Sequence, residues 1–73
     1  MTKDRVKVAV VGCGVVATAY YLPYLMRMNT VDLVAVCDLY RTRTEACARL
    51  FGAKQQYLDY YEMLDKADLD AIF

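Results

Sequence analysis

The stretch VAVVGCGVVA, residues 8–17, decides how this chain folds. It reads as a short apolar strand that runs into a glycine turn and then into a helix. Its glycines and the following alanine fit G-x-G-x-x-A, a form of the fingerprint by which strand–turn–helix units bind dinucleotides. The alternative interpretation is a glycine turn that only connects a strand to a helix, and the rest of the chain has to decide between the two.

Each small residue of the pattern has a physical task. Gly12 can adopt the backbone angles of a tight turn that a side chain would oppose. Gly14 lets a pyrophosphate approach the backbone, and Ala17 lets the helix pack closely on the strand. The first amides of a helix have no partners within it, and the positive end of the helix dipole lies there. An anionic phosphate satisfies both.

Composition and charge narrow the class of protein. The 73 residues are 59% hydrophobic and carry no formal net charge, which excludes a disordered composition. A neutral chain lacks the basic footprint of a nucleic-acid or membrane-surface protein. No apolar run approaches the roughly 20 residues of a membrane span, and the N-terminus does not read as a signal peptide. We therefore predict a cytoplasmic protein without nucleic-acid or membrane partners.

Reactive side chains are few in this sequence. Cys13, Cys37 and Cys47 form no C-x-x-C pair, and the chain has no histidine. A metal site of the zinc type is therefore not expected, and neither is a catalytic pair that contains histidine. We expect each cysteine to be a small buried apolar residue. Cys13 lies within the glycine turn, where its oxidation would block a ligand.

The apolar pattern predicts four strands and three helices in strict alternation. The strands are expected at 6–11, 31–37, 53–57 and 71–73, and the helices at 15–28, 41–51 and 60–66. Pro23 predicts a kink or a restart of the first helix near Leu22. Gly52 is expected to end the second helix, and Asp59 with Glu62 to begin the third as a capping-box pair.

Such alternation predicts an α/β fold of Rossmann type, which is a doubly wound parallel sheet. The series β-α-β-α-β-α-β corresponds to its first half, with right-handed crossovers, helices on both faces and the strand order 3-2-1-4. The glycine turn and Asp38 follow neighbouring strands at their carboxyl ends, where open α/β sheets bind ligands. This coincidence favours the dinucleotide interpretation of the turn.

Asp38 and two arginines concern the choice of cofactor. An acid at the end of the second strand hydrogen-bonds the adenosine ribose, although Asp38 would also suit a turn or a helix cap. Arg41 and Arg43 would suit either a solvated helix surface or a clamp on the 2′-phosphate of NADP. The cofactor therefore stays NAD or NADP, with NAD slightly favoured, because a carboxylate repels the phosphate that an arginine attracts.

Four segments resemble the start of the glucose–fructose oxidoreductase/inositol dehydrogenase (Gfo/Idh/MocA) family. They are KVAVVGCG (7–14) with Ala17, YLPYL (21–25), VDLVAVCD (31–38), and YLDYYEML (57–64) leading to DLDAI (68–72). The second and fourth segments are more specific than the glycine motif, which many dehydrogenases share. Tyr21 departs from the family pattern, since members often carry histidine there.

This resemblance implies the nucleotide-binding part of an oxidoreductase that moves hydride between a nicotinamide cofactor and a sugar, polyol or related carbinol. It implies that Val15 and Val16 help to shape the pyrophosphate site, that Asp38 holds the ribose, and that Arg43 lines the adenine end. The predicted cofactor site comprises Gly12, Cys13, Gly14, Val15, Val16, Ala17, Asp38 and Arg43. The family's catalytic lysine lies in a Glu-Lys-Pro segment that is absent from this sequence.

We therefore expect residues 1–73 to be the N-terminal portion of a dinucleotide-binding domain that has no catalytic residue of its own. Two other classes of function stay open, a stand-alone module that binds a nucleotide without catalysis and an interaction domain whose glycine turn is empty. The chain stops within an apolar stretch, which favours the enzyme fragment. An apolar strand at a sheet edge is a template for pairing, so we predict self-association through residues 71–73.

Overall fold

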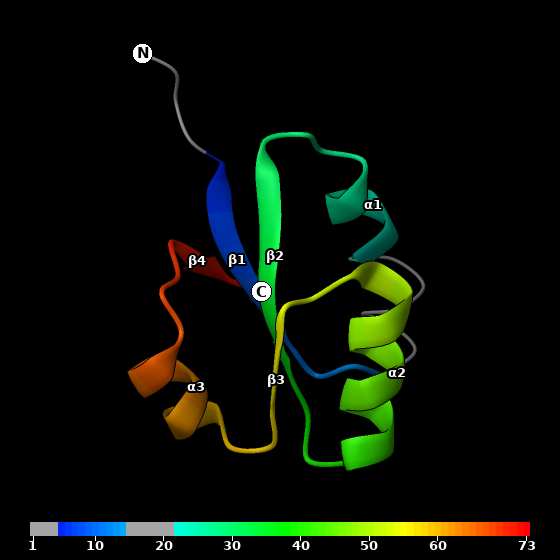
Figure 1. The fold of residues 1–73 in the computed structure, drawn as a ribbon, viewed down its shortest axis with the longest axis vertical. Coiled ribbons are helices and arrows are strands. Elements are labelled where there is room, and N and C mark those ends of the chain that lie inside the picture. Colours follow the sequence, from blue (N-terminus) through cyan, green and yellow to red (C-terminus); the bar gives the residue numbers. More distant parts are fainter. Residues whose placement is uncertain (1–4, 15–21) are drawn as a thin grey trace.

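The computed structural model of the protein describes residues 5–14 and 22–73 (Figure 1). Its four strands are β1 (Val6–Val11), β2 (Val31–Cys37), β3 (Gln55–Tyr57) and β4 (Ala71–Ile72). They form one sheet in the order β3-β2-β1-β4, and every neighbouring pair is parallel. The predicted Rossmann-type fold and its strand order are therefore confirmed.

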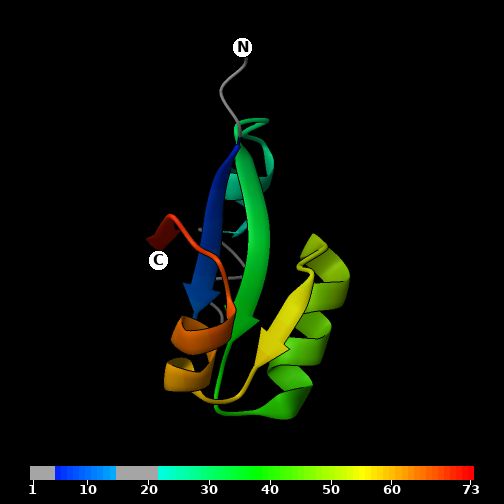
Figure 2. The same cartoon turned by 60° about the vertical axis from the view of Figure 1, so that its left-hand side comes forward.

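Helices cover both faces of this sheet. The helix α1 (Leu22–Met26) and the helix α2 (Arg41–Phe51) lie on one face, and α3 (Tyr60–Lys66) lies on the other (Figures 1 and 2). The bounds predicted for α2 and α3 are confirmed. The first helix ends at Met26 rather than at the predicted Met28, because the chain already turns towards β2 there. Its expected part over 15–21 lies outside the described residues.

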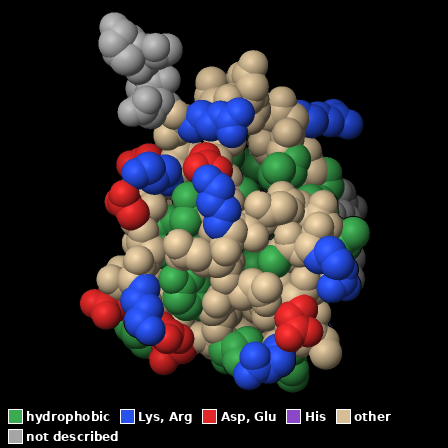
Figure 3. Space-filling model, in the orientation of Figure 1, with side chains coloured by type: hydrophobic (Ala, Val, Ile, Leu, Met, Phe, Trp, Pro, Cys, Tyr) green, Lys and Arg blue, Asp and Glu red, His purple; other side chains and the backbone are tan. Residues whose placement is uncertain are grey.

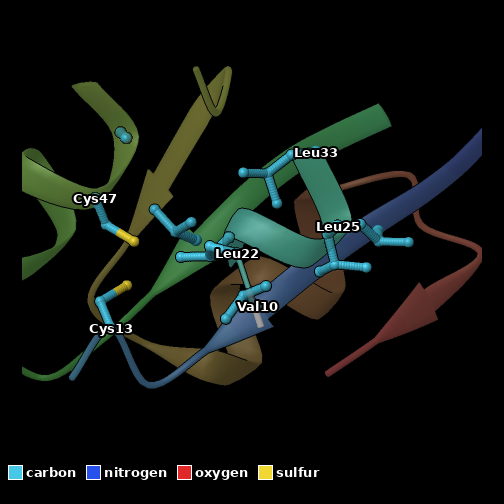
Figure 4. Packing of buried hydrophobic residues seen from close by; sticks show 9 residues of the cluster. Val10, Cys13, Leu22, Leu25, Leu33 and Cys47 are labelled. Carbon is cyan, nitrogen blue, oxygen red and sulfur yellow. The ribbon is translucent and has the colours of Figure 1, made fainter. Parts of the chain in front are cut away.

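The sheet carries an apolar cluster on each face, as its aliphatic strands predict. The first cluster contains Val8, Val10, Cys13, Leu22, Leu25, Leu33, Val36, Cys47 and Ala48 (Figure 4). The second contains Ala9, Val34, Ala35, Cys37 and Met63. A register shift between Val8 and Ala9 leaves Val34 without a partner in β1, so that the strand residues beyond it pair as Val10 with Val36 and Val11 with Cys37. The ends of β1 and β2 are thereby aligned.

The two edge strands are shorter than predicted. β3 begins at Gln55 rather than at position 53, and β4 ends at Ile72 rather than at position 73. The pairing nevertheless extends past β4, because the Phe73 amide donates to Ala9 and the Phe73 carbonyl accepts from Val11, both at 2.9 Å. Edge strands have a partner on one side only, which limits how far their ladder extends.

The helix ends confirm one predicted signal and correct another. Gly52 ends α2 in the left-handed region at φ 77° and donates its N–H to the Ala48 carbonyl, as predicted. Asp59 caps α3 by accepting from the Tyr61 N–H at 2.9 Å. The second contact of the predicted capping box, in which Glu62 would accept from the Asp59 N–H, is not among the described contacts, and this part of the prediction is wrong. Glu62 instead accepts from the Lys66 ammonium at 2.9 Å, since an ion pair with a cation one turn on competes for its carboxylate.

An apolar groove of about 510 Å³ lies beside β1, between α1 and the end of the described chain. Val6, Val8, Tyr24, Leu25 and Phe73 are among the residues that line it. Among the described helices, none has both the length and the apolar character needed to cross a bilayer.

Candidate functional site

The glycine turn follows β1 at the point where β2 also ends. The Gly12 N–H donates to the Cys37 carbonyl at 2.7 Å, which holds the start of the turn against β2. Gly12 has a φ of +90°, a region that L side chains rarely adopt, although a Cβ there would meet no atom of the described residues within 4 Å. Backbone conformation, and not lack of space, therefore demands glycine at this position.

Gly14 presents the opposite case. Its φ is not among the positive values of the described glycines, and an added Cβ would have its nearest contact with an Arg43 guanidinium nitrogen at 4.0 Å. That distance is ordinary van der Waals contact with the end of a flexible side chain. Among the described residues, none would therefore exclude a side chain at position 14, and the close approach of a bound group is the reason for glycine that the fingerprint offers.

Asp38 joins the glycine turn to the loop between β2 and α2. Its Oδ2 accepts from the Cys13 N–H at 2.7 Å, and its Oδ1 accepts from the Tyr40 N–H at 2.9 Å. The residue is buried, with an exposed fraction of 8%. Asp38 thus lies at the predicted place, and the turn geometry that was its alternative interpretation is present as well.

The charge of Asp38 is stabilised by its neighbours. Burial by itself raises the pKa of the Asp38 carboxyl, but the N–H groups of Tyr40 and Cys13 and the positive charge of Arg43 lower it by more. The net result is a pKa below the ordinary value of 3.8. Asp38 is therefore a buried carboxylate at neutral pH, and each of its oxygens already accepts a backbone hydrogen bond.

Arg43 lies over the turn with its head towards solvent. A guanidinium nitrogen is 3.9 Å from Asp38 Oδ2, which is too long for a hydrogen bond, and the guanidinium carbon is 4.8 Å from the centre of the Tyr40 ring. About half of the Arg43 side chain is exposed. Arg43 is thus adjacent to Asp38 and Gly14 without being locked to either of them, whereas Arg41 is an exposed residue of the first turn of α2.

Cys13 points from the turn into the core. Its sulfur faces Cys47 of α2 (Figure 4), and its thiol also donates to the Cys37 carbonyl over 3.8 Å. Burial, together with a hydrogen bond between the two thiols, raises the pKa of Cys13 to about 12. All three cysteines are free and buried, which confirms their expected role as small apolar residues. Cys13 is therefore a protonated packing residue at neutral pH.

The structure brings five of the eight predicted site residues to one end of the sheet. They are Gly12, Cys13, Gly14, Asp38 and Arg43. The other three, Val15, Val16 and Ala17, lie outside the described residues. Sequence reasoning missed Tyr40, whose amide binds Asp38 and whose ring contacts Arg43. An aspartate two residues before this amide is a known turn signal and would have indicated the contact.

Charged side chains elsewhere in the described chain pair with one another. Three ion pairs, at 2.7 to 3.1 Å, join Lys7 to Asp68, Lys54 to Asp32 and Lys66 to Glu62. On the face drawn in Figure 3, basic side chains lie beside acidic ones in several places and do not form one basic field. Within residues 5–14 and 22–73, no group of three or more acidic, cysteine or histidine side chains could hold a metal ion.

Comparison with known proteins gives a consistent family assignment. Residues 6–73 match the profile of Gfo/Idh/MocA proteins, described as an oxidoreductase family with an NAD-binding Rossmann fold. The chain is 34% identical over 64 residues to D-glucoside 3-dehydrogenase of Escherichia coli, a match that covers 88% of this chain and 18% of that protein.

Solved structures agree with this assignment. The myo-inositol 2-dehydrogenase of Lactobacillus plantarum is 28% identical with a TM-score of 0.87, over 96% of this chain and 21% of its own. The WlbA dehydrogenase of Chromobacterium violaceum, solved with NADH and UDP-GlcNAcA, is 26% identical with a TM-score of 0.88, and the match covers 99% of this chain and 21% of that protein. A 3-ketoreductase of Actinomadura kijaniata, solved with NADP and TDP-benzene, is 25% identical with a TM-score of 0.84, and the match covers 94% of this chain and 21% of that protein. This chain spans about a fifth of the length of these proteins.

Proposed function

The chain belongs to the Gfo/Idh/MocA oxidoreductase family with its NAD-binding Rossmann fold, and we propose that it is the cofactor-binding part of an enzyme that oxidises or reduces a sugar, polyol or related carbinol. The substrate class is supported by the D-glucoside and inositol dehydrogenases among its relatives. The whole enzyme contains residues 1–73 as the N-terminal portion of its dinucleotide-binding domain, which is supported by the share of the relatives' length that this chain spans.

The observation that carries this proposal is the position of Asp38 beside the glycine turn. Asp38 directly follows β2, its carboxylate accepts from the Cys13 N–H of the turn, and Gly14 follows directly after Cys13. Ligands of open α/β sheets bind beyond the carboxyl ends of neighbouring strands, and that is where these groups meet. A negatively charged acceptor and a backbone open to close approach suit the ribose and the pyrophosphate of one dinucleotide.

The described residues fit a nicotinamide dinucleotide on their own chemistry. Among the described residues, the nearest atom to a Cβ added at Gly14 is the end of the long Arg43 side chain at 4.0 Å, which leaves room for a close ligand on that side. Asp38 would accept hydrogen bonds from the ribose hydroxyls through its remaining lone pairs, and Arg43 would lie along the adenine end. When bound, the cofactor supplies the hydride chemistry, and this part of the chain holds and orients it.

We propose NAD as the preferred cofactor. A buried carboxylate whose pKa is lowered stays charged and would repel a 2′-phosphate, which supports NAD. The exposed head of Arg43 supports NADP as the alternative, because a guanidinium binds phosphate well and Arg43 is not locked in place.

Titration calorimetry of the full-length protein with NADH and NADPH tests the proposal. Gly14→Val should abolish binding of both while the far-ultraviolet circular dichroism stays unchanged. Asp38→Ala should weaken NADH binding by about 1.5–3 kcal/mol, the range for a hydrogen bond to a charged group, and NADPH binding by less. Wild-type protein that binds neither cofactor would overturn the proposal, and equal losses for both would assign Asp38 to the turn alone.

The 73-residue chain by itself is proposed to be inactive and prone to self-association. Its lysines at 7, 54 and 66 form ion pairs, which supports the first point, since a base has to reach the reacting hydroxyl. The exposed Ile72 and Phe73 at the β4 edge support the second. Absorbance of reduced nicotinamide with a panel of sugars and polyols tests activity against a Gly14→Val control. A sedimenting monomer would contradict self-association.

A stand-alone module that binds a nucleotide without catalysis is the second candidate. It is supported by the same site, because nothing in the geometry of Asp38 and the glycine turn requires a second domain. Activity measurements on the full-length protein distinguish the two. The formal net charge of zero, and the mixed signs on the face drawn in Figure 3, support our proposal of a cytoplasmic protein whose partners are small molecules.

A further inference from the structure

The Cys13 amide is held by a side chain that lies far away in the sequence. Asp38 Oδ2 accepts its N–H at 2.7 Å, and both residues are buried, with exposed fractions of 5% for Cys13 and 8% for Asp38. The preceding amide, that of Gly12, is held separately by the Cys37 carbonyl. The two consecutive N–H groups of the turn are therefore both bonded to the end of β2, one to backbone and one to a carboxylate.

We propose that Asp38 is a positioning residue of the glycine turn, in addition to any contact that it makes with a ribose. Its carboxylate fixes the Cys13 N–H, and with it the backbone that leads into Gly14, before any ligand arrives. The consequence for binding rests on the proposed function, because it assumes that an anionic pyrophosphate lies on this turn. The ligand-free arrangement of the turn does not rest on it.

The buried Cys13 N–H depends on the Asp38 carboxylate for its hydrogen bond. Since the amide is buried, losing its acceptor would leave it unsatisfied, which is costly away from water. The Tyr40 N–H donates to the other oxygen of the carboxylate at 2.9 Å. A carboxylate accepts at both oxygens, whereas the side-chain amide of asparagine accepts at one end and donates at the other. Asp38→Asn can therefore keep at most one of the two bonds without changing the shape of the side chain.

The chain also offers a matched control. Asp59 accepts from the Tyr61 N–H at 2.9 Å, as Asp38 does from the Tyr40 N–H, but Asp59 is exposed and belongs to the cap of α3. Asp59→Asn removes the same charge and perturbs the same kind of local turn. An effect that appears with Asp38→Asn and is absent from Asp59→Asn therefore reports the bond to Cys13.

Residue-resolved hydrogen exchange of the ligand-free, full-length protein tests the inference directly. In Asp38→Ala, which keeps neither bond, the Cys13 amide should exchange about tenfold faster or more, and the Gly12 amide should change less because its acceptor is intact. Asp38→Asn should have the same effect on Cys13 when its oxygen faces Tyr40. In Asp59→Asn, the Cys13 amide should exchange as in the wild type. Unchanged Cys13 exchange in Asp38→Ala would overturn the positioning role and would leave the cofactor proposal untouched.

Competition by inorganic pyrophosphate tests the consequence for binding. Pyrophosphate has no ribose, so a residue that only holds the ribose would leave the inhibition constant of pyrophosphate unchanged once the displacement curve is corrected for the measured affinity of NADH. A positioning role predicts a several-fold higher inhibition constant for Asp38→Ala, and the wild-type inhibition constant for Asp59→Asn. Wild-type protein that fails to bind NADH would overturn the proposed function, whatever the exchange experiment shows.

A measurement on the wild type covers the case in which the Asp38 variants do not fold. A through-hydrogen-bond scalar coupling should connect the Cys13 amide nitrogen with the Asp38 carboxyl carbon in isotope-labelled, ligand-free protein. Detection of this coupling supports the inference, and its absence from a spectrum that shows the backbone couplings of the β1–β2 pairing overturns it.

Discussion

Asp38 and Asp59 lie in the βα loops of successive units, Asp38 directly after β2 and Asp59 at the N-cap of α3, and their side chains make different contacts. Each follows a parallel strand, precedes a helix, and accepts from the N–H two residues on at 2.9 Å. The second oxygen of Asp38 reaches the Cys13 amide of another loop, and Asp38 is buried. Asp59 is exposed, and its described hydrogen bond stays within the cap of α3.

The difference originates in the sheet and not in the local sequence. β2 is an inner strand whose end lies beside the end of β1, so an aspartate after it meets a second loop. β3 is an edge strand with β2 as its neighbour, so the aspartate after it faces solvent. The same kind of hydrogen bond to the N–H two residues on therefore belongs to a candidate ligand site only where two parallel strands end together, which is where open α/β sheets generally bind ligands.

The largest expected effect is on stability when each aspartate is truncated. Asp38→Ala removes two hydrogen bonds to a charged acceptor and leaves the buried Cys13 N–H without its acceptor. We therefore expect the free energy of unfolding to fall by about 3 kcal/mol. Asp59→Ala removes an exposed helix cap, and we expect a loss of about 1 kcal/mol. Urea denaturation of the two variants beside the wild type measures both. Equal losses would show that the bond to Cys13 adds nothing to the folded state.

The dependence of the unfolding free energy on acid pH should also report the contribution of the Asp38 carboxylate. Because its neighbours lower the pKa of Asp38 in the folded protein, the carboxylate stabilises the fold fully above its unfolded pKa. This stabilisation is lost as the pH falls from about 4 through the lower folded pKa. Asp38→Asn should therefore flatten the acid limb of a plot of unfolding free energy against pH. An acid limb as steep as that of the wild type would mean that Asp38 does not favour its charged form.

Two glycines provide a smaller test of whether conformation or position matters. Gly12 in the glycine turn and Gly52 at the end of α2 both have positive φ, at 90° and 77°. A Cβ added at either position would meet no described atom within 4 Å. Alanine at either position should therefore cost a similar amount, roughly 1–2 kcal/mol. Only Gly12→Ala should also weaken NADH binding, which calorimetry measures. Weakened binding in Gly52→Ala at constant fold would contradict a site confined to the end of β1 and β2.

Much of the fold could be predicted because local signals and tertiary position agree. The aliphatic runs of β1 and β2, the glycine that ends α2 and the aspartate that caps α3 each gave bounds that the structure confirms. The errors fall where pairing sets the limits, at β3 and β4, where two partners compete for one carboxylate, at Glu62, and at the end of α1, where the chain turns towards β2 before Met28. The pattern placed Asp38 at the end of β2 but could not show that its oxygens accept from two loops, since that depends on the alignment of β1 with β2.

Arg43→Ala should have the smallest effect on stability and a separate effect on cofactor choice. The Arg43 guanidinium is half exposed and 3.9 Å from Asp38 Oδ2, so solvent screens the pair, and its contact with Tyr40 is also at the surface. We expect a loss of less than about 1 kcal/mol in urea denaturation.

This variant separates the two groups that face Asp38. If the backbone amides fix the carboxylate, the Cys13 amide should exchange in Arg43→Ala as it does in the wild type, because both N–H bonds to Asp38 are kept. If the guanidinium fixes it instead, Arg43→Ala should accelerate Cys13 exchange as much as Asp38→Ala does. Calorimetry on the same sample should show a larger loss for NADPH than for NADH, because only NADPH carries the 2′-phosphate that a guanidinium binds. Equal losses would remove Arg43 from the choice between the two cofactors.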